Sequence, residues 1–162
     1  MDIVTYPHNA LRLEAGDVKD IDTQVAETAQ QMVEAMHAAE GIGLAAPQVD
    51  LPWRVFVVHV KNDRPRIFIN PEIIQTSMET TVYEEGCLSI PGVYADVERA
   101  AEVQVQAYNE RGRPFSLTAD GMLARVILHE YDHLKGVLFF DHLKERPRTK
   151  LLRDYEQLVG AR

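Results

Sequence analysis

The sequence contains a single cysteine, Cys87, among its 162 residues. One cysteine cannot form an intramolecular disulfide, so the chain is not a disulfide-stabilised secreted scaffold, and we expect it in a reducing compartment. The sequence also lacks an apolar run of the roughly 20 residues that a membrane helix requires, and its first residues, MDIVTYPHNA, lack the basic and apolar regions of a signal peptide. These absences predict a cytoplasmic protein with no membrane partner.

Positive charge is the scarcer sign, with 17 lysines and arginines against 25 aspartates and glutamates and a net charge of −8. A surface of this kind is poorly suited to gripping phosphate backbones, so no specific nucleic-acid binding is expected. The chain also lacks internal repeats, low-complexity tracts and linkers rich in Gly, Ser or Pro, so residues 1–162 are expected to form a single domain. A domain of this length can fold without a structural metal, so any metal that it binds is expected to be functional.

Hydrophobic patterning predicts an α+β fold, because strands fill the middle of the chain and helices flank them without regular alternation. Three helices are expected, from Asp22 to Gly41, from Asp120 to Gly136 and, after a break at Pro147, over residues 149–159. Strands are expected over residues 53–60, 66–70, 80–84, 102–108 and 114–117. Asp22 or Thr23 is predicted to cap the first helix, and the Asp120 carboxylate is predicted to cap the second.

The second expected helix contains an HExxH pattern, His129-Glu130-Tyr131-Asp132-His133. Two histidines four residues apart lie one above the other on a helical face, so both imidazoles can bind one ion about 2.0–2.1 Å from each nitrogen. Glu130 is offset from that face, which suits a general base beside the ion better than a ligand. The pattern predicts His129 and His133 as metal ligands.

The third metal ligand decides the kind of site. The metzincin extension HExxHxxGxxH is excluded, because Phe139 occupies the position of its third histidine. Cys87 follows an expected strand and can supply a thiolate, which would give a Cys/His/His site with one open position for water. A lone cysteine is otherwise a small buried apolar side chain, and Glu156, on a later helix, is the ligand that a gluzincin-type peptidase would use.

A glycine-rich segment, GIGLAAPQ at residues 41–48, follows the first expected helix. It lacks the GK[ST] ending of a phosphate loop and follows a helix rather than a strand, so a phosphate cradle is not expected. Gly41 and Gly43 permit a tight turn and a close approach to a ligand. Gln48 carries an amide that can donate hydrogen bonds to a developing oxyanion.

Together the segments GIGLAAPQ at 41–48, EGCLS at 85–89 and HEYDH at 129–133 resemble, in order and spacing, the three signature motifs of the peptide deformylase family. The resemblance implies a fold of antiparallel or mixed strands packed around a central metal-binding HExxH helix, with one N-terminal and one C-terminal helix. It implies the metal ligands Cys87, His129 and His133, and it implies the catalytic residues Glu130, Gln48, Leu88 and Gly43. An ion pair between Glu85 and Arg99 is implied as a support of the site.

The activity implied by this resemblance is hydrolysis of the N-formyl group from the initiator methionine of nascent polypeptides, with release of formate. The implied cofactor is one divalent ion per chain, Fe2+, and the same donors also suit Zn2+, Ni2+ and Co2+. The implied partners are N-formyl-methionyl peptides and, transiently, the ribosome. Two alternatives stay open: a gluzincin-like zinc endopeptidase that uses Glu156, and a noncatalytic metal-binding module.

A methionine side chain requires an apolar pocket. Residues beside the three motifs are expected to line it: Ile42, Tyr83, Met122 and Val126. Their alternative role is ordinary core packing. Two positions depart from the commonest family pattern, since Tyr94 stands where many members have arginine and Leu128 where glutamine is frequent.

Overall fold

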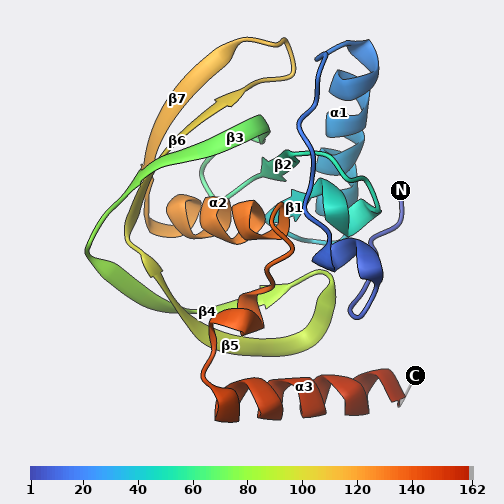
Figure 1. Cartoon of the computed structure of the whole chain (residues 1–162), viewed down its shortest axis with the longest axis vertical. Coiled ribbons are helices and arrows are strands. Elements are labelled where there is room, and N and C mark those ends of the chain that lie inside the picture. Colours follow the sequence, from blue (N-terminus) through green and yellow to red (C-terminus); the bar gives the residue numbers. More distant parts are fainter. Residues whose placement is uncertain (161–162) are drawn as a thin grey trace.

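The computed structural model describes residues 1–160 and shows an α+β architecture (Figure 1). The α-helices are α1 (Thr23–Ala38), α2 (Gly121–His133) and α3 (Glu145–Gly160). The strands are β1 (Gly43–Ala45), β2 (Val55–Val58), β3 (Arg66–Thr76), β4 (Thr80–Cys87), β5 (Ile90–Ala100), β6 (Glu102–Tyr108) and β7 (Pro114–Asp120). Short 3-10 helices cover Asn9–Arg12 (η1), Ala46–Val49 (η2) and Phe139–His142 (η3).

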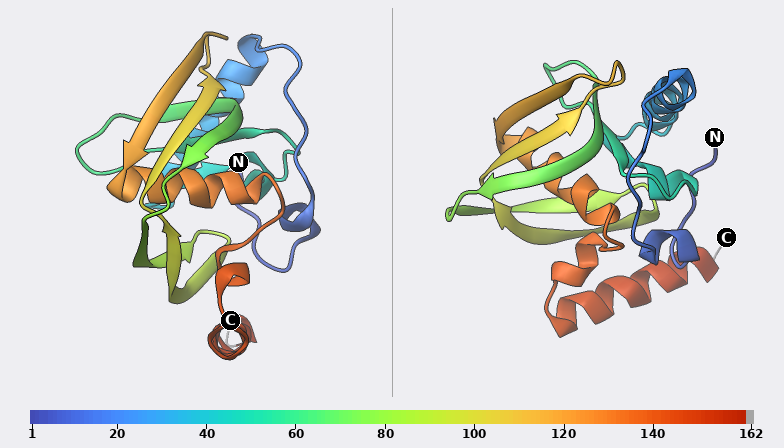
Figure 2. Two further views of the ribbon diagram at one scale, coloured as in Figure 1. Left: turned by 60° about the vertical axis from the view of Figure 1, so that its left-hand side comes forward. Right: turned by 45° about the horizontal axis from the view of Figure 1, so that its top comes forward.

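The strands form two antiparallel sheets. One has the order β1-β2-β3-β6-β7, and the other is the pair β4-β5. Helix α2 contacts strands of both sheets, and two directions of view show it with the β4–β5 pair below and β6 and β7 above (Figures 1 and 2). Helix α3 packs on the outer side of β5. The C-terminal ends of β7 and β4 therefore reach the same helix from different sheets.

Apolar side chains fill three clusters between these layers. One lies between α2 and the five-stranded sheet and includes the fully buried Phe56, Phe68 and Ile127. A second packs α1 against β1 and β2, and a third joins η3, β5 and α3 around Phe139 and Tyr155. Burial of this apolar area is the main favourable contribution to folding, and it fixes α2 against both sheets.

Helix α1 begins as predicted, because the Asp22 carboxylate accepts a hydrogen bond from the Val25 N–H at 3.0 Å. Its predicted end at Gly41 is three residues too late. The helix stops at Ala38, and Glu40 takes the left-handed conformation with φ of 58°. Gly41 closes the turn by donating its N–H to the Met36 carbonyl at 2.9 Å.

Helix α2 begins directly after Asp120, as predicted, but its cap and its end differ from the prediction. Asp120 precedes the helix in an extended conformation, but its side chain makes no capping hydrogen bond, so the predicted carboxylate cap is wrong. The helix ends at His133 rather than Gly136, which instead adopts φ of 75° in the turn that follows. Left-handed geometry suits glycine, which explains its place just beyond the helix.

Helix α3 begins at Glu145, so the predicted break at Pro147 is wrong. Pro147 lies in the first turn of the helix, where its missing N–H would have no partner within the helix in any case. Strand β5 was not predicted at all, because Pro91 and Gly92, whose φ is 88°, lie near its beginning. Strand β3 runs past the predicted end at Asn70 through a register shift in its pairing with β6.

Within residues 1–160 no helix is both long enough and apolar enough to cross a membrane.

Candidate metal centre and active site

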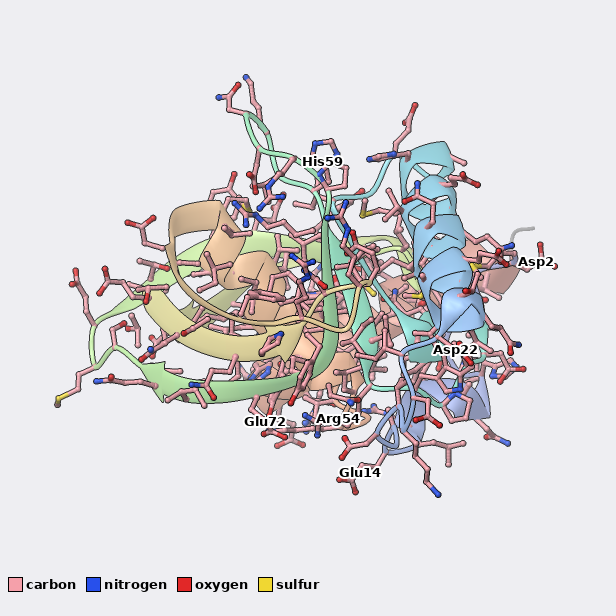
Figure 3. All side chains as sticks on the ribbon, turned by 90° about the horizontal axis from the view of Figure 1, so that it is seen from above. Asp2, Glu14, Asp22, Arg54, His59 and Glu72 are labelled. Carbon is pink, nitrogen blue, oxygen red and sulfur yellow. The ribbon has the colours of Figure 1, made fainter. Side chains whose placement is uncertain are left out.

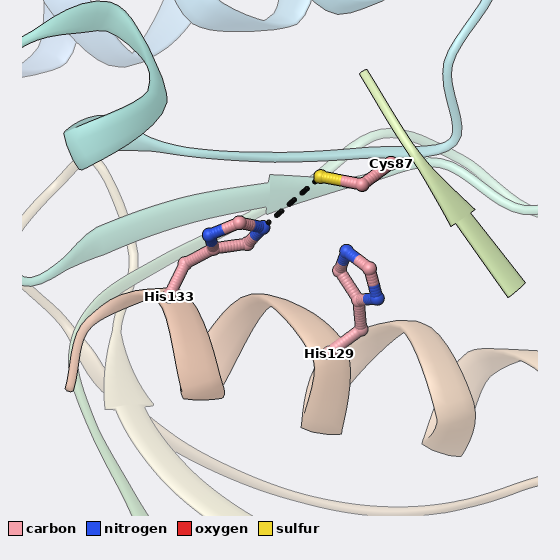
Figure 4. A group of neighbouring side chains, drawn as sticks. All are labelled: Cys87, His129 and His133. Atoms are coloured by element: carbon pink, nitrogen blue, oxygen red, sulfur yellow. Dashed lines mark hydrogen bonds between the residues drawn. The ribbon is translucent and has the colours of Figure 1, made fainter. Parts of the chain in front are cut away.

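Three donor side chains meet where β4 ends over α2. Cys87 is the last residue of β4, and His129 and His133 come from successive turns of α2 (Figure 4). The cysteine sulfur and one nitrogen from each imidazole all lie within 4.8 Å of one another, and Cys87 Sγ is 3.4 Å from His133 Nε2. One thiolate and two imidazoles at this spacing can hold a single tetrahedral ion with one position left open.

A buried carboxylate orients one of these imidazoles. Glu85, only 6% exposed, accepts a hydrogen bond from His129 Nδ1 at 2.9 Å. Since Nδ1 carries the proton, Nε2 of the neutral ring has its lone pair free for an ion. Burial raises the pKa of Glu85, but the hydrogen bonds from His129 and Arg99 outweigh it and lower the pKa to about 2. The carboxylate is therefore ionised throughout the physiological range.

Arg99 links Glu85 to Asp132, a second carboxylate on α2. Its guanidinium donates to both Glu85 oxygens at 2.6 and 3.0 Å, so the implied Glu85–Arg99 ion pair is present. The same guanidinium donates to Asp132 at 2.9 Å, and Asp132 also lies 2.7 Å from Nε2 of His142. A continuous chain of hydrogen-bonded side chains thus runs from His142 in η3, through Asp132, Arg99 and Glu85, to the imidazole of His129.

Arg125 is a second buried cation on Glu85 and was not singled out from the sequence. Its Nη1 donates to Glu85 at 2.6 Å and to the Val97 carbonyl at 2.9 Å. Its Nη2 donates to the carbonyl of Thr81 at 2.9 Å. Arg125 lies one turn before His129 on α2, so the i, i+4 spacing was the one signal in the sequence that could have found it. It ties α2 to both strands of the β4–β5 pair.

Glu130 lies deeper than any other carboxylate of the site. It is 3% exposed, its Oε1 has no hydrogen-bond partner within the described chain, and its Oε2 is 4.0 Å from His129 Nε2. Burial raises the pKa of Glu130 to about 7, against the lowering effect of His129 and Arg99. A carboxylate with this pKa can both accept and release a proton near neutral pH.

Gly43 lets the β1 backbone approach this carboxylate. A Cβ built on Gly43 would overlap the Glu130 carboxylate and would lie 2.7 Å from Val126 Cγ1. Real Cβ atoms essentially never come so close, so any side chain at position 43 would displace these groups. The glycine at this position is required by close packing rather than by an unusual backbone angle.

Gln48 faces the sulfur of Cys87. Its Oε1 accepts the Ala45 N–H at 2.9 Å, which fixes the amide orientation. Its Nε2 then donates to the Ser89 hydroxyl at 3.1 Å and lies 3.5 Å from Cys87 Sγ. The side chain is 1% exposed, so its donors lie in a region from which bulk water is excluded. Ser89, which shares the hydrogen bond, was not singled out from the sequence.

A cavity of about 510 Å3 opens onto this cluster. All but one of the candidate site residues lie in its lining: Ile42, Gly43, Gln48, Tyr83, Cys87, Leu88, Met122, Val126, His129 and Glu130. His133 does not line the cavity, but its Nε2 contacts the sulfur of Cys87, which does. Leu88 lies in the turn between β4 and β5, next to the donor cysteine.

The mouth of the cavity is partly aromatic. Tyr83 and Tyr94 are 54% and 63% exposed. The Tyr94 ring lies against Gly86, so closely that a Cβ there would be 2.6 Å from the ring. Ile42 is exposed at the same opening, whereas Val126 also belongs to the core between α2 and the five-stranded sheet. Leu128 points into that core too.

Glu156, the alternative metal ligand, is exposed on α3 and does not belong to the donor cluster. The neighbouring Leu151 and Tyr155 are the α3 residues that pack against β5. The position of Glu156 is that of a residue on the solvated face of an amphipathic helix.

The charge distribution of the cluster fits a bound cation. Burial lowers the pKa of His129, but Glu130, Cys87 and Glu85 raise it well above the ordinary value, so positive charge is favoured at this point. Burial and the neighbouring His129 lower the pKa of His133 well below the ordinary value, which keeps its ring neutral and able to coordinate. The unpartnered Glu130 Oε1 is a further acceptor in the same space.

The fold is antiparallel α+β, and it brings a Cys/His/His donor cluster next to a buried glutamate on an HExxH helix. This combination defines a class of mononuclear metallohydrolases. Comparison with known proteins narrows the class. The profile of the polypeptide deformylase family matches residues 1–149. The chain belongs to this family and is an enzyme of the peptide deformylase type.

Relatives match along the whole chain. A peptide deformylase of Borreliella burgdorferi is 46% identical over 163 residues, which cover 100% of this chain and 99% of the relative. A crystal structure of a peptide deformylase from Synechococcus elongatus in complex with actinonin has a TM-score of 0.90 at 43% identity, covering 94% of this chain and 86% of that one. The enzyme from Legionella pneumophila has a TM-score of 0.93 at 35% identity, covering 99% and 97%. These likenesses confirm the expected family and its α+β fold.

Proposed function

We propose that the chain is a metal-dependent hydrolase that removes the N-formyl group from the N-terminal formyl-methionine of newly synthesised polypeptides. The observation that carries the proposal is the convergence of Cys87, His129 and His133 with the buried, unpartnered carboxylate of Glu130 at one cavity. Family membership supports the reaction, and the donor set supports its dependence on a metal. The HExxH helix is, on this proposal, the centre around which the two sheets assemble a single catalytic domain.

Cys87, His129 and His133 would hold one divalent ion. The family resemblance favours Fe2+, and Zn2+, Ni2+ or Co2+ suit the same thiolate and imidazole donors. When bound, the ion supplies Lewis-acid polarisation of the reacting oxygens. Ionised Glu85 keeps the His129 ring in the tautomer that leaves Nε2 free, so a residue outside the ligand set controls the ligand's orientation.

Glu130 moves the proton in this mechanism. Its carboxylate takes a proton from the attacking water while the water oxygen bonds to the formyl carbon. It then gives that proton to the amide nitrogen as the carbon–nitrogen bond breaks, which leaves formate and a peptide with a free amino group. A pKa of about 7 suits both halves of this exchange.

Gln48 and Leu88 would stabilise the charge that develops on the formyl oxygen. The Nε2 donors of Gln48 lie beside Cys87 Sγ, and the backbone N–H of Leu88 follows the same cysteine. Removal of one such donor typically costs about 2.7–4 kcal/mol of transition-state stabilisation. The amide of Gln48 is held in place by Ala45, so little reorganisation is required during the reaction.

The substrate methionine would occupy the apolar part of the cavity. Ile42, Tyr83, Met122 and Val126 are the candidate contacts, and all four lie in its lining. The close approach of Gly43 to Glu130 leaves little space around the reacting carbon, which favours a formyl group over bulkier acyl groups. Equal rates on formyl and acetyl peptides would contradict this account of selectivity.

We further propose that this activity takes place in the cytoplasm, where formylated chains are synthesised, with transient ribosome contact. The basic residues available for such a contact lie just before α3 and along it: Lys144, Arg146, Arg148, Lys150 and Arg153. Of these, Lys150 is already paired with Asp154 at 2.9 Å.

Formate release from a formyl-methionyl dipeptide tests the function. Protein prepared without oxygen is supplied in turn with Fe2+, Ni2+, Co2+ and Zn2+. Glu130→Gln keeps the size of the side chain but removes the base, so kcat should fall by about 10²–10⁴. Undiminished release by this variant would refute the assignment of the base.

Two further variants separate the metal sites of the competing functions. Cys87→Ala should lose bound metal, whereas Glu156→Gln should retain both metal and formate release. The opposite pattern, together with cleavage of internal peptide bonds, would indicate a gluzincin-like peptidase. Wild-type protein that binds one equivalent of each ion but releases no formate would indicate a noncatalytic module.

A further inference from the structure

Two histidines outside the active site, His37 and His59, lie in contact at the surface. His37 belongs to the last turn of α1, and His59 directly follows β2. His37 Nε2 is 2.8 Å from His59 Nδ1, and the ring centroids are 5.0 Å apart. Figure 3 shows the His59 side chain near the edge of the molecule, where solvent can reach it. Neither residue lines the active-site cavity.

The protonation of His59 follows from its other neighbour. Its Nε2 lies 2.8 Å from the backbone carbonyl of Asp63, which can only accept a hydrogen bond. The proton of the neutral ring is therefore on Nε2, and Nδ1 presents a lone pair toward His37. This is the arrangement found in metal-binding histidines, whose second nitrogen usually donates to a carbonyl or carboxylate that fixes the ring.

The carbonyl that holds His59 is itself well fixed. The Asp63 side chain accepts two hydrogen bonds from Arg66, at 2.7 and 3.1 Å, and its N–H donates to Val60 at 3.2 Å. The His59 backbone N–H donates to the Ile42 carbonyl at 2.8 Å. His59 is therefore oriented before any ligand arrives, which reduces the entropy that binding must overcome.

We propose that His37 and His59 form a second metal site, for a late first-row divalent cation such as Ni2+, Cu2+ or Zn2+. Two nitrogens that bind one ion at about 2.0–2.1 Å, with roughly a right angle between the bonds, lie about 2.8–3.0 Å apart, close to the spacing of these two rings. When the ion binds, the ring proton of His37 moves from Nε2 to Nδ1, and the exposed His37 ring turns so that its Nε2 lone pair points at the ion.

The surroundings favour a cation at this surface. Glu34 lies one turn before His37 on α1 and Glu40 lies three residues after it, and neither takes part in an ion pair within residues 1–160. No third donor side chain in that part of the chain completes a three-ligand group here. Water fills the remaining positions, so the site binds more weakly than the Cys/His/His centre.

Occupation of this site would join the end of α1 to the end of β2. The segment between His37 and β1 includes Glu40, Gly41 and Ile42, which lie at the mouth of the active-site cavity. A cation bound by both histidines restrains both ends of this segment, because His59 also holds the Ile42 carbonyl. The inference does not depend on the reaction that the enzyme catalyses.

Titration with Ni2+ tests the proposal. Protein that already carries one equivalent of Ni2+ is titrated with more Ni2+ by calorimetry in a buffer that does not coordinate metals. We expect a second, weaker binding event in the wild-type protein. His37→Gln and His59→Gln should each weaken it at least about tenfold, the smallest loss typical of changes to partners around a metal.

The control variant is His8→Gln, which removes another exposed histidine whose Nδ1 accepts the Ala10 N–H. It should leave the second event unchanged. A second readout uses the wild-type protein alone: paramagnetic Ni2+ should selectively broaden the ring signals of His37 and His59 as the second equivalent is added. Binding of one equivalent only, or a second event that persists in both variants, would overturn the proposal.

Discussion

Replacement of Glu85 by glutamine removes the one negative charge on which two buried arginines and a metal-site histidine converge. Arg99 and Arg125 both donate to this carboxylate at 2.6 Å, and His129 donates at 2.9 Å. A glutamine side chain has similar size, but it leaves the buried Arg125 guanidinium without its counter-charge, and Arg99 keeps only its ion pair with Asp132. Its amide NH2 also faces donors where Glu85 offered only acceptors.

Two independent considerations give the magnitude. Removal of one partner from a buried ion pair typically costs about 3–5 kcal/mol. The lowering of the Glu85 pKa from 4.5 to about 2 corresponds to about 3 kcal/mol of stabilisation by the charged form. We therefore expect Glu85→Gln to lower the free energy of unfolding at neutral pH by about 3 kcal/mol.

The pH dependence has a definite sign. Because folding lowers the pKa of Glu85, its contribution is fully present above about 4.5 and is lost as the pH falls toward about 2. A protonated Glu85 is neutral, as glutamine is, so wild type and variant should converge in stability across this range. Asp132, whose pKa is also lowered despite its burial, is present in both proteins and contributes little to the difference.

Urea unfolding of metal-stripped protein at a series of pH values measures this difference without a contribution from bound ion. The matched control is Glu84→Gln on the same strand, an exposed carboxylate without an ion-pair partner in the described chain, which should change stability by no more than about 0.5 kcal/mol. A Glu85→Gln difference that stayed constant between neutral pH and pH 3, or that matched the control, would refute the reasoning. Metal affinity should fall about 10–100-fold in parallel, as is typical when the partner of a metal-binding histidine is removed.

Two further predictions concern backbone features. Gly43→Ala places a methyl group against the Glu130 carboxylate and 2.7 Å from Val126, so formate release should fall at least about tenfold. Circular dichroism should still show a folded protein, and an unimpaired rate would contradict the packing. Asp22→Ala removes the hydrogen bond that caps α1, so the free energy of unfolding measured in urea should fall by about 1 kcal/mol while kcat stays unchanged. The control is Asp20→Ala, and an equal loss of stability in that variant would show that Asp22 has no specific capping role.

The features of the fold that could be predicted from the sequence are the local ones. The HExxH helix and the α1 cap depend on residues within one or two turns of each other, and their patterns predict α1 and α2 to within a few residues. Strand β5 was missed because Pro91 and Gly92 normally interrupt a strand. Here these two residues lie near the beginning of the strand, and pairing with β4 along the rest of its length stabilises the extended conformation despite them.

The ion-pair chain behind the metal centre illustrates what the sequence could not predict. The implied Glu85–Arg99 pair came from family resemblance, while Arg125 and His142 were not predicted in any role. These groups come from β4, β5, α2 and η3, and only the tertiary fold brings them together. Charged residues on separate elements carry no periodic signal, so pattern analysis assigns them by default to solvated surfaces.

Glu85 and Glu130 face the same imidazole, yet their pKa values are shifted in opposite directions, to about 2 and about 7. Both side chains are buried, so burial alone cannot explain the difference. Glu85 accepts hydrogen bonds from two arginines and His129, whereas Glu130 Oε1 has no partner within residues 1–160. The number of donors therefore assigns the roles: the fully satisfied carboxylate stays ionised and orients the ring, and the unsatisfied one can exchange a proton near neutral pH. An arginine that donated hydrogen bonds to Glu130 would keep this carboxylate ionised as well. The site would then contain two permanently charged carboxylates and no base.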